Sequence, residues 1–223
     1  EIKAESLRVK EETDKEVKIF LQELEMGREI ELKIPLTNQQ YDGIFCVING
    51  EKTLDGIKVL SKPVFIKKWD EYYSRYKNRE ERDIYGEPQV IRIRGEEKEG
   101  KIESYFTIKR KSKENGIEFN EENETYIENP DVLRDFFNVA CYIRFFEKCK
   151  EAWGCNVCVS ENPQAEFHLE LEKVNQYFYV EIEYTKEDMD PKIVGQLLET
   201  LVRKLGLNPK DKDSRSWGKI LLG

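Results

Sequence analysis

The chain has 223 residues, of which 37% are charged and 39% are apolar, and its net charge is -8. This length suits one large or two small domains, and the acidic balance argues against a general nucleic-acid-binding surface, which is normally basic. No run of about 18 apolar residues is present, so the sequence predicts no membrane-spanning helix. The first 25 residues are charged throughout and show no secretion leader, so we expect a cytoplasmic protein.

Apolar periodicity predicts a helix followed by a strand, a second helix, a second strand and a charged loop in the first part of the chain. These elements are expected at residues 13–26, 28–36, 37–49, 63–76 and 77–88. The second helix begins with a capping box, because Thr37 is followed three residues later by Gln40. We assign residues 1–27 to an N-terminal helical extension and residues 28–223 to a single domain.

The remaining chain is predicted to be mostly strands. They are expected at residues 89–95, 103–111, 118–127, 142–152, 155–160, 166–174 and 177–185. Helices should begin at Asn129-Pro130 and Asp190-Pro191, since an N-cap followed by proline starts a helix. We expect Val132, Phe136 and Val139 to form the buried face of the first of these. So many strands with short turns favour an antiparallel barrel or sandwich.

Several strands alternate charged with aliphatic residues, as in Glu29-Ile30-Glu31-Leu32-Lys33, Ile91-Arg92-Ile93-Arg94 and Val180-Glu181-Ile182-Glu183. Such a strand has one apolar and one charged face. One such strand could simply face water. Acidic and basic sets in the same chain are better explained by a cavity, in which carboxylates bind a divalent cation and basic groups bind phosphate.

The arginine pair suggests a consequence for stability. Arg92 and Arg94 share one strand face and should repel each other unless an anion lies between them. We therefore expect their removal to leave the empty protein unchanged or more stable.

The ordered motifs resemble those of CYTH proteins, also called triphosphate tunnel metalloenzymes. Glu29 to Lys33 resembles the ExExK signature, Arg92 and Arg94 an R-x-R strand, and Thr107 and Lys109 a T-x-K strand. Further likenesses are Asp70 to Tyr73, Glu122 and Glu124, Lys148 and Lys150, Leu171 to Val174, and Tyr179 to Glu183. The resemblance covers about residues 28–205. Lys150 stands where the family has arginine, and Glu172 where it has aspartate.

The resemblance implies an α+β fold, a closed antiparallel eight-stranded β-tunnel (a barrel) with helices packed outside. It also implies the site residues and a Mg²⁺ or Mn²⁺ cofactor. The catalytic residues would be Glu29, Glu31 and Lys33. The phosphate-binding residues would be Lys33, Arg92, Arg94, Lys109, Lys148 and Lys150. The metal-binding candidates are Glu29, Glu31, Glu122, Glu124, Glu181 and Glu183, of which we favour Glu29, Glu31 and Glu183.

The function implied by the resemblance is hydrolysis of the terminal phosphate of a small-molecule triphosphate, such as tripolyphosphate or a nucleoside triphosphate. Two alternatives stay open: an adenylyl cyclase that forms cyclic AMP and pyrophosphate, and a non-catalytic polyphosphate-binding module. We expect no membrane partner and no nucleic acid other than a 5′-triphosphate end. A homodimer also stays open.

Other conspicuous residues carry less information. The odd cysteine count favours reduced thiols, and Cys155 and Cys158 lack the second pair that a structural zinc needs. Whether these two cysteines bind anything stays open. His168 is the only histidine, and we expect it to be structural. Trp69, Tyr72 and Tyr73 fit a core or rim better than a base-stacking site.

Overall fold

The protein is represented by a computed structural model that describes residues 27–77, 80–81, 84, 89–114, 117–184, 186 and 188–222. The predicted helix at 13–26, and with it nearly all of the proposed extension 1–27, lies outside the described residues. The first described strand begins at Gly27, one residue earlier than expected. No helix in these ranges combines the length and the apolar character needed to cross a membrane.

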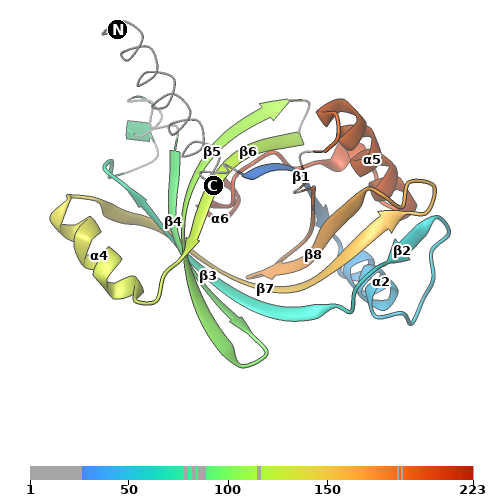
Figure 1. Ribbon diagram of the computed structural model, residues 1–223, viewed down its shortest axis with the longest axis horizontal. Coiled ribbons are helices and arrows are strands. Elements are labelled where there is room, and N and C mark those ends of the chain that lie inside the picture. The colour runs from blue at the N-terminus through green and yellow to red at the C-terminus, as the bar shows by residue number, and fades with distance from the viewer. Residues whose placement is uncertain are drawn as a thin grey trace, which may run out of the picture.

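Eight antiparallel strands close into a ring, with a ninth strand outside it (Figure 1). The strands are β1 (Gly27–Leu36), β2 (Ile57–Val59), β3 (Val64–Ser74), β4 (Gln89–Lys98), β5 (Lys101–Glu114), β6 (Ile117–Tyr126), β7 (Ile143–Val159), β8 (Glu166–Val174) and β9 (Tyr177–Tyr184). Their order is β2-β7-β3-β4-β5-β6-β1-β9-β8, and pairing of β7 with β8 closes the ring. The closed eight-stranded barrel with outer helices that the resemblance implied is confirmed. We call its interior the tunnel.

The main apolar core lies outside the tunnel. Leu32 on β1, Leu169 on β8 and Ile182 on β9 are buried against the helices α2 (Asn38–Ile48) and α5 (Pro191–Lys204). Both helices lie against the same side of the ring in Figure 1. Because neighbouring residues of a strand face opposite ways, this placement turns the charged residues between the aliphatic ones into the tunnel.

The predicted helix starts agree with the structure. Thr37 caps α2 in a reciprocal capping box with Gln40. Asn129 caps α4 (Pro130–Val139) and Asp190 caps α5, each followed by proline at the first helical turn. The chain ends in a short 3-10 helix (Pro209–Asp211) and in α6 (Trp217–Leu222).

The predicted buried face of α4 is wrong. Val132, Phe136 and Val139 are exposed, whereas Phe137 is 3% exposed and packs on Tyr73 and Ile93 of the outer barrel wall. The helix carries two adjacent apolar stripes, and the aromatic rings of the wall select the one that contains Phe137.

The two strands predicted at 142–152 and 155–160 are one continuous strand, β7. Gly154, which lies between the two predicted strands, permits a close approach: an added Cβ would lie 3.2 Å from the ring of His168 on β8. Cys158 lies three positions after Cys155 on one strand, so the two side chains point to opposite faces. Both are buried free thiols, and this geometry does not allow them to chelate one zinc ion together.

Candidate active site

Ion pairs run across the tunnel between strands that are not neighbours in the sheet. Lys109 on β5 lies 3.0 Å from Glu29 and 3.6 Å from Glu31, both on β1, which pairs with β6 rather than with β5. Lys68 on β3 contacts Glu170 on β8 across β7. The charged faces of the strands therefore meet one another inside the ring.

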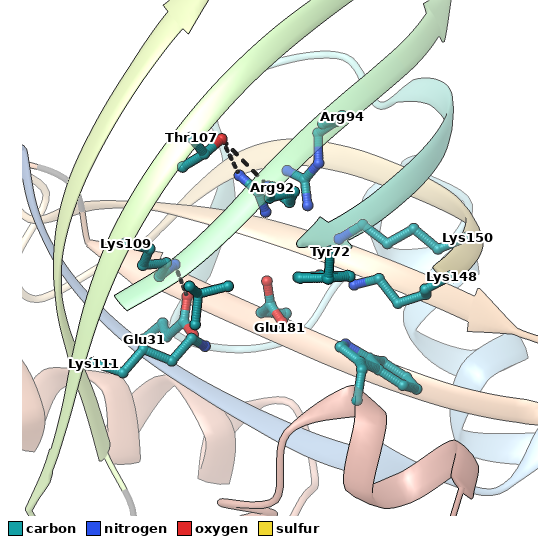
Figure 2. A pocket seen from close by; sticks show the side chains of 12 residues that line it. Glu31, Tyr72, Arg92, Arg94, Thr107, Lys109, Lys111, Lys148, Lys150 and Glu181 are labelled. Carbon is teal, nitrogen blue, oxygen red and sulfur yellow. Dashed lines mark hydrogen bonds and ion pairs between the residues drawn. The ribbon is translucent and has the colours of Figure 1, made fainter. Parts of the chain in front are cut away.

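A cavity of about 70 Å³ lies within this charged interior. Figure 2 shows Arg92, Arg94, Lys148 and Lys150 pointing toward a common space that Glu181 also faces. The other side chains of its lining are Glu31, Tyr72, Val90, Thr107, Lys109, Lys111 and Trp217. The structure thus brings together five of the six predicted phosphate-binding residues around one cavity.

Each of the two arginines has its own carboxylate partners, which offset the repulsion between Arg92 and Arg94. Arg92 lies 2.9 Å from Glu122 and 3.0 Å from Glu124 and also donates to Thr107. Arg94 lies 2.7 Å from Asp70. Burial would raise the pKa of Asp70, but Arg94 and Lys148 hold that pKa well below its usual value. These ion pairs are a reason to expect the opposite of the sequence-based prediction, namely that removing either arginine destabilises the protein.

One carboxylate cluster joins β1 to β9. Oxygens of Glu29, Glu31 and Glu183 lie within 4.8 Å of one another. Burial, opposed by Lys109 and reinforced by Glu122 and Glu31, raises the pKa of Glu29 to about 7. Burial together with Glu29 and Glu170 raises the pKa of Glu183 well above its usual value. Burial thus disfavours the charged forms of Glu29 and Glu183, and a divalent cation bound beside them would offset that cost.

A second cluster contains Glu170, Glu172 and Glu181, also within 4.8 Å. Lys150 contacts both Glu170 and Glu172, so an ammonium group already bridges two of its three members. Burial, with Glu181 as the next cause, raises the pKa of Glu172 to about 7. Lys109 likewise bridges Glu29 and Glu31 of the first cluster, at 3.0 Å and 3.6 Å. Neither Glu181 nor Glu183 has a lysine or arginine of the described chain within ion-pair distance. The ion pairs of the first cluster are longer than the 2.7 Å pair of Lys150 with Glu170, so its carboxylates are less firmly held by ammonium groups and fit a metal ion better.

Carboxylates outnumber cations among the described side chains of the tunnel. The cations are Lys33, Lys68, Arg92, Arg94, Lys109, Lys111, Lys148 and Lys150. The carboxylates are Glu29, Glu31, Asp70, Glu96, Glu118, Glu122, Glu124, Glu170, Glu172, Glu181 and Glu183. A polyanion entering such a tunnel would be repelled unless divalent cations accompanied it.

The remaining predicted site residues have more specific surroundings. Lys33 donates to the backbone carbonyl of Arg215, and burial lowers the pKa of its ammonium group. Glu122 lies 2.8 Å from Lys109. Burial would raise the pKa of Glu122, but Lys109 and Arg92 lower that pKa to about 2. Glu124 accepts from Thr107. Neither Glu122 nor Glu124 belongs to a carboxylate cluster, so both neutralise cations in the structure, whereas Glu181 joins the second cluster.

Several tunnel residues were not selected from the sequence. They are Lys68, Asp70, Glu118, Asn120, Glu170, Glu172 and Trp217. Glu118 and Asn120 could have been found because they share the inward face of β6 with Glu122 at spacings of two residues. Both polar atoms of the Asn120 side chain are buried without a partner. Trp217 lies far along the chain in a segment without strand pattern, and no sequence signal places it here.

The structure also places the aromatic residues and the single histidine for which the sequence predicts a structural role. The indole of Trp69 packs over Gly95 on the outer wall, while Tyr72 lines the cavity and Tyr73 packs on α4. His168 contacts Asn156 at 3.0 Å and lies 3.7 Å from Glu170.

No family model and no curated protein sequence matches this chain. Solved structures do. A Pyrococcus horikoshii protein has a TM-score of 0.64 at 20% identity, covering 87% of this chain and 98% of its own. A candidate adenylate cyclase from Vibrio parahaemolyticus has a TM-score of 0.59 at 16% identity, covering 88% and 99%.

A third similar structure is a candidate adenylyl cyclase from Hippeastrum with a dominant triphosphatase activity. Its TM-score is 0.52 at 16% identity, and the alignment covers 80% of this chain and 88% of that one. At these identities the likeness concerns the fold. The fold of this chain is therefore the tunnel fold that the resemblance to the CYTH family predicts.

Proposed function

We propose that this chain is a metal-dependent hydrolase that removes the terminal phosphate of a triphosphate inside the tunnel. The observation that carries the proposal is the joint geometry of the cavity. A group of buried cations faces it, and a cluster of three carboxylates, of which Glu31 also lines the cavity, lies beside it. The activity of the Hippeastrum protein, which has the same fold, adds support.

Glu29, Glu31 and Glu183 would hold Mg²⁺ or Mn²⁺, since hard divalent cations prefer carboxylate oxygens. Such an ion would supply positive charge beside the phosphates and lower the pKa of water. Arg92, Arg94 and Lys109 would exchange part of their contact with carboxylates for contact with phosphate oxygens. With Lys148 and Lys150 they would stabilise the charge that develops on the phosphoryl group during transfer.

Hydrolysis is favoured over cyclisation because the cavity lining addresses phosphate more than a nucleoside. Most of the lining side chains are ionic, and its aromatic members are Tyr72 and Trp217. A cyclase must also hold the ribose 3′-oxygen in line with the α-phosphate, and alignment of this kind is worth several orders of magnitude in rate. No described group of the lining is committed to that alignment.

The test is product analysis with tripolyphosphate and ATP in the presence of Mg²⁺ or Mn²⁺. We expect orthophosphate to be released. Glu31→Gln should lower kcat about 100-fold or more, because the amide keeps the shape of the side chain and loses its charge. Glu97→Gln is the matched control, since the Glu97 side chain is exposed and does not belong to the lining of the cavity.

Each alternative has its own outcome. Cyclic AMP and pyrophosphate as the main products from ATP would replace the hydrolase with a cyclase. Binding of tripolyphosphate without any product would replace it with a binding module. Full activity of Glu31→Gln would remove the first carboxylate cluster from the reaction.

A further inference from the structure

The C-terminal segment 207–222, here called the strap, crosses one end of the tunnel. The backbone N–H of Asp213 donates to the carbonyl of Lys33 on β1 at 2.9 Å. The hydroxyl of Tyr179 on β9 donates to the Asp213 carboxylate at 2.8 Å. Beyond these contacts α6 packs against Phe146 of β7 and Val174 of β8. The strap thus spans from β1 to β7 at the end where β8 turns into β9.

Trp217 is the residue through which the strap reaches the cavity. It is 8% exposed and belongs to the cavity lining with Arg92 and Lys148. Its Nε1–H is buried and has no hydrogen-bond partner. Buried polar groups nearly always have a hydrogen-bond partner, because a buried group without one loses its hydrogen bonds to water and gains none in the protein. The unpaired donor therefore calls for an acceptor that arrives with the ligand.

The surroundings of the indole indicate the charge of that acceptor. The ammonium groups of Lys33 and Lys148 lie 5.6 Å and 5.3 Å from the ring centroid. Both lie close enough for cation–π attraction. An anion held by either ammonium group would lie near the indole, where its oxygens could meet the N–H. Phosphate oxygens accept strongly from such donors, and a donor that cannot be deprotonated suits them.

We propose that Trp217 is a substrate-binding residue whose Nε1–H donates to a phosphate oxygen of the triphosphate. This inference rests on the function proposed above. It assigns part of the substrate site to the C-terminal strap rather than to the barrel. The competing explanation is a purely structural role, in which the indole packs edge-to-face on Tyr179 at 4.8 Å between centroids and supports the two lysines.

Trp217→Phe separates the two explanations, because phenylalanine keeps an aromatic face and loses the N–H. With tripolyphosphate and Mg²⁺ we expect KM to rise roughly tenfold, the value of one hydrogen bond to a charged group, while the melting temperature stays near that of the parent. Trp69→Phe is the control, since Trp69 packs on the outer wall over Gly95, and its KM should be unchanged.

A second measurement does not depend on the folding of that variant. In the parent and in Trp69→Phe, saturating tripolyphosphate should change the intrinsic tryptophan fluorescence before the substrate is consumed, and in Trp217→Phe the change should be lost. An unchanged KM in a folded Trp217→Phe, or no emission change in the parent during turnover, would overturn the proposal while leaving the hydrolase intact. A parent that neither binds nor hydrolyses tripolyphosphate would overturn both.

Discussion

Arg94 neutralises a carboxylate that water does not reach. Asp70 is 1% exposed, and its two oxygens accept from Arg94 at 2.7 Å and 3.1 Å. Lys148 lies 3.2 Å from the same carboxylate. These pairs bring no large net stability, because burying each charge costs most of what the pair gains. Removing one partner, however, leaves an unpaired buried charge and lowers the free energy of unfolding.

Arg94→Ala should therefore destabilise the empty protein. We expect the free energy of unfolding to fall by about 3 kcal/mol, near the lower end for a broken buried pair because Lys148 remains. Urea denaturation measures it. Adding Asp70→Asn to this variant should recover part of the loss, since the uncompensated carboxylate is then gone. Equal stability of parent and Arg94→Ala would show that the Asp70 pair does not form in solution.

Glu29, which we propose as a metal ligand, should make metal binding depend on pH. Burial raises its pKa to about 7 in the empty tunnel, and a metal ligand must be deprotonated. Below pH 7 the bound proton competes with the metal ion. Mg²⁺ or Mn²⁺ affinity should thus rise about tenfold between pH 6 and pH 8 and level off above pH 8. Calorimetry in buffers of different ionisation enthalpy should show proton release at pH 6.

The raised pKa of Glu29 also makes the stability of the metal-free protein depend on pH. Between its ordinary pKa of 4.5 and about 7, Glu29 is more protonated in the folded than in the unfolded chain. Its contribution to stability is therefore lost as the pH rises through that window. A metal affinity that does not change between pH 6 and pH 8 would contradict the assignment of Glu29 as a ligand.

At the scale of elements, α4 shows how a helix can be anchored by one of two apolar stripes. Phe137 lies 4.5 Å from Tyr73 and 6.0 Å from Phe106 between ring centroids. The neighbouring Phe136 is 59% exposed. On this side of the barrel the outward aromatic residues of β3 and β5 therefore form a small second core with α4.

Phe137→Ala should lower the free energy of unfolding by about 3–5 kcal/mol, as expected for a buried phenylalanine. Phe136→Ala is the matched control one position away and should change it by about 0.5 kcal/mol or less. Thermal or urea unfolding of the two variants measures the difference. Similar losses in both would indicate that the exposed stripe is also packed in solution.

Much of the element pattern could be predicted because it is local. Alternation gave the inward positions of Glu29, Glu31 and Lys33, and the caps gave the start of each long helix. The α4 face could not be predicted because both stripes are apolar and a distant strand decides between them. The pairing of Arg94 with Asp70, and the position of Trp217, likewise depend on which strands meet across the ring.

For the whole molecule, stability and metal binding should be separable. The larger apolar cluster lies between the ring and the helices α2 and α5, outside the tunnel. Removal of a divalent cation changes only the charged interior. We therefore expect EDTA to stop activity while unfolding stays cooperative.

Binding of metal ion and substrate should raise the thermal stability, because a ligand that binds only the folded state stabilises that state. With Mg²⁺ and tripolyphosphate at about 100 times Kd, the melting temperature should rise by about 5 °C or more. Scanning calorimetry measures both effects. Unfolding on chelation alone would mean that a metal ion holds the fold together.

The position of the core outside the barrel also bears on how such a protein can change. The strands have two sets of side chains with different roles. The outward side chains pack against the helices and stabilise the fold, and the inward side chains contact any ligand in the tunnel. Substitutions in the inner set can alter charge and shape while the packing between wall and helices persists. A library restricted to inward positions of β4, β5 and β8, with the buried pair of Arg94 and Asp70 kept, should therefore retain more folded members than one of equal size at outward positions. Substitutions confined to the inward positions should therefore be enough for the barrel to bind new anionic ligands.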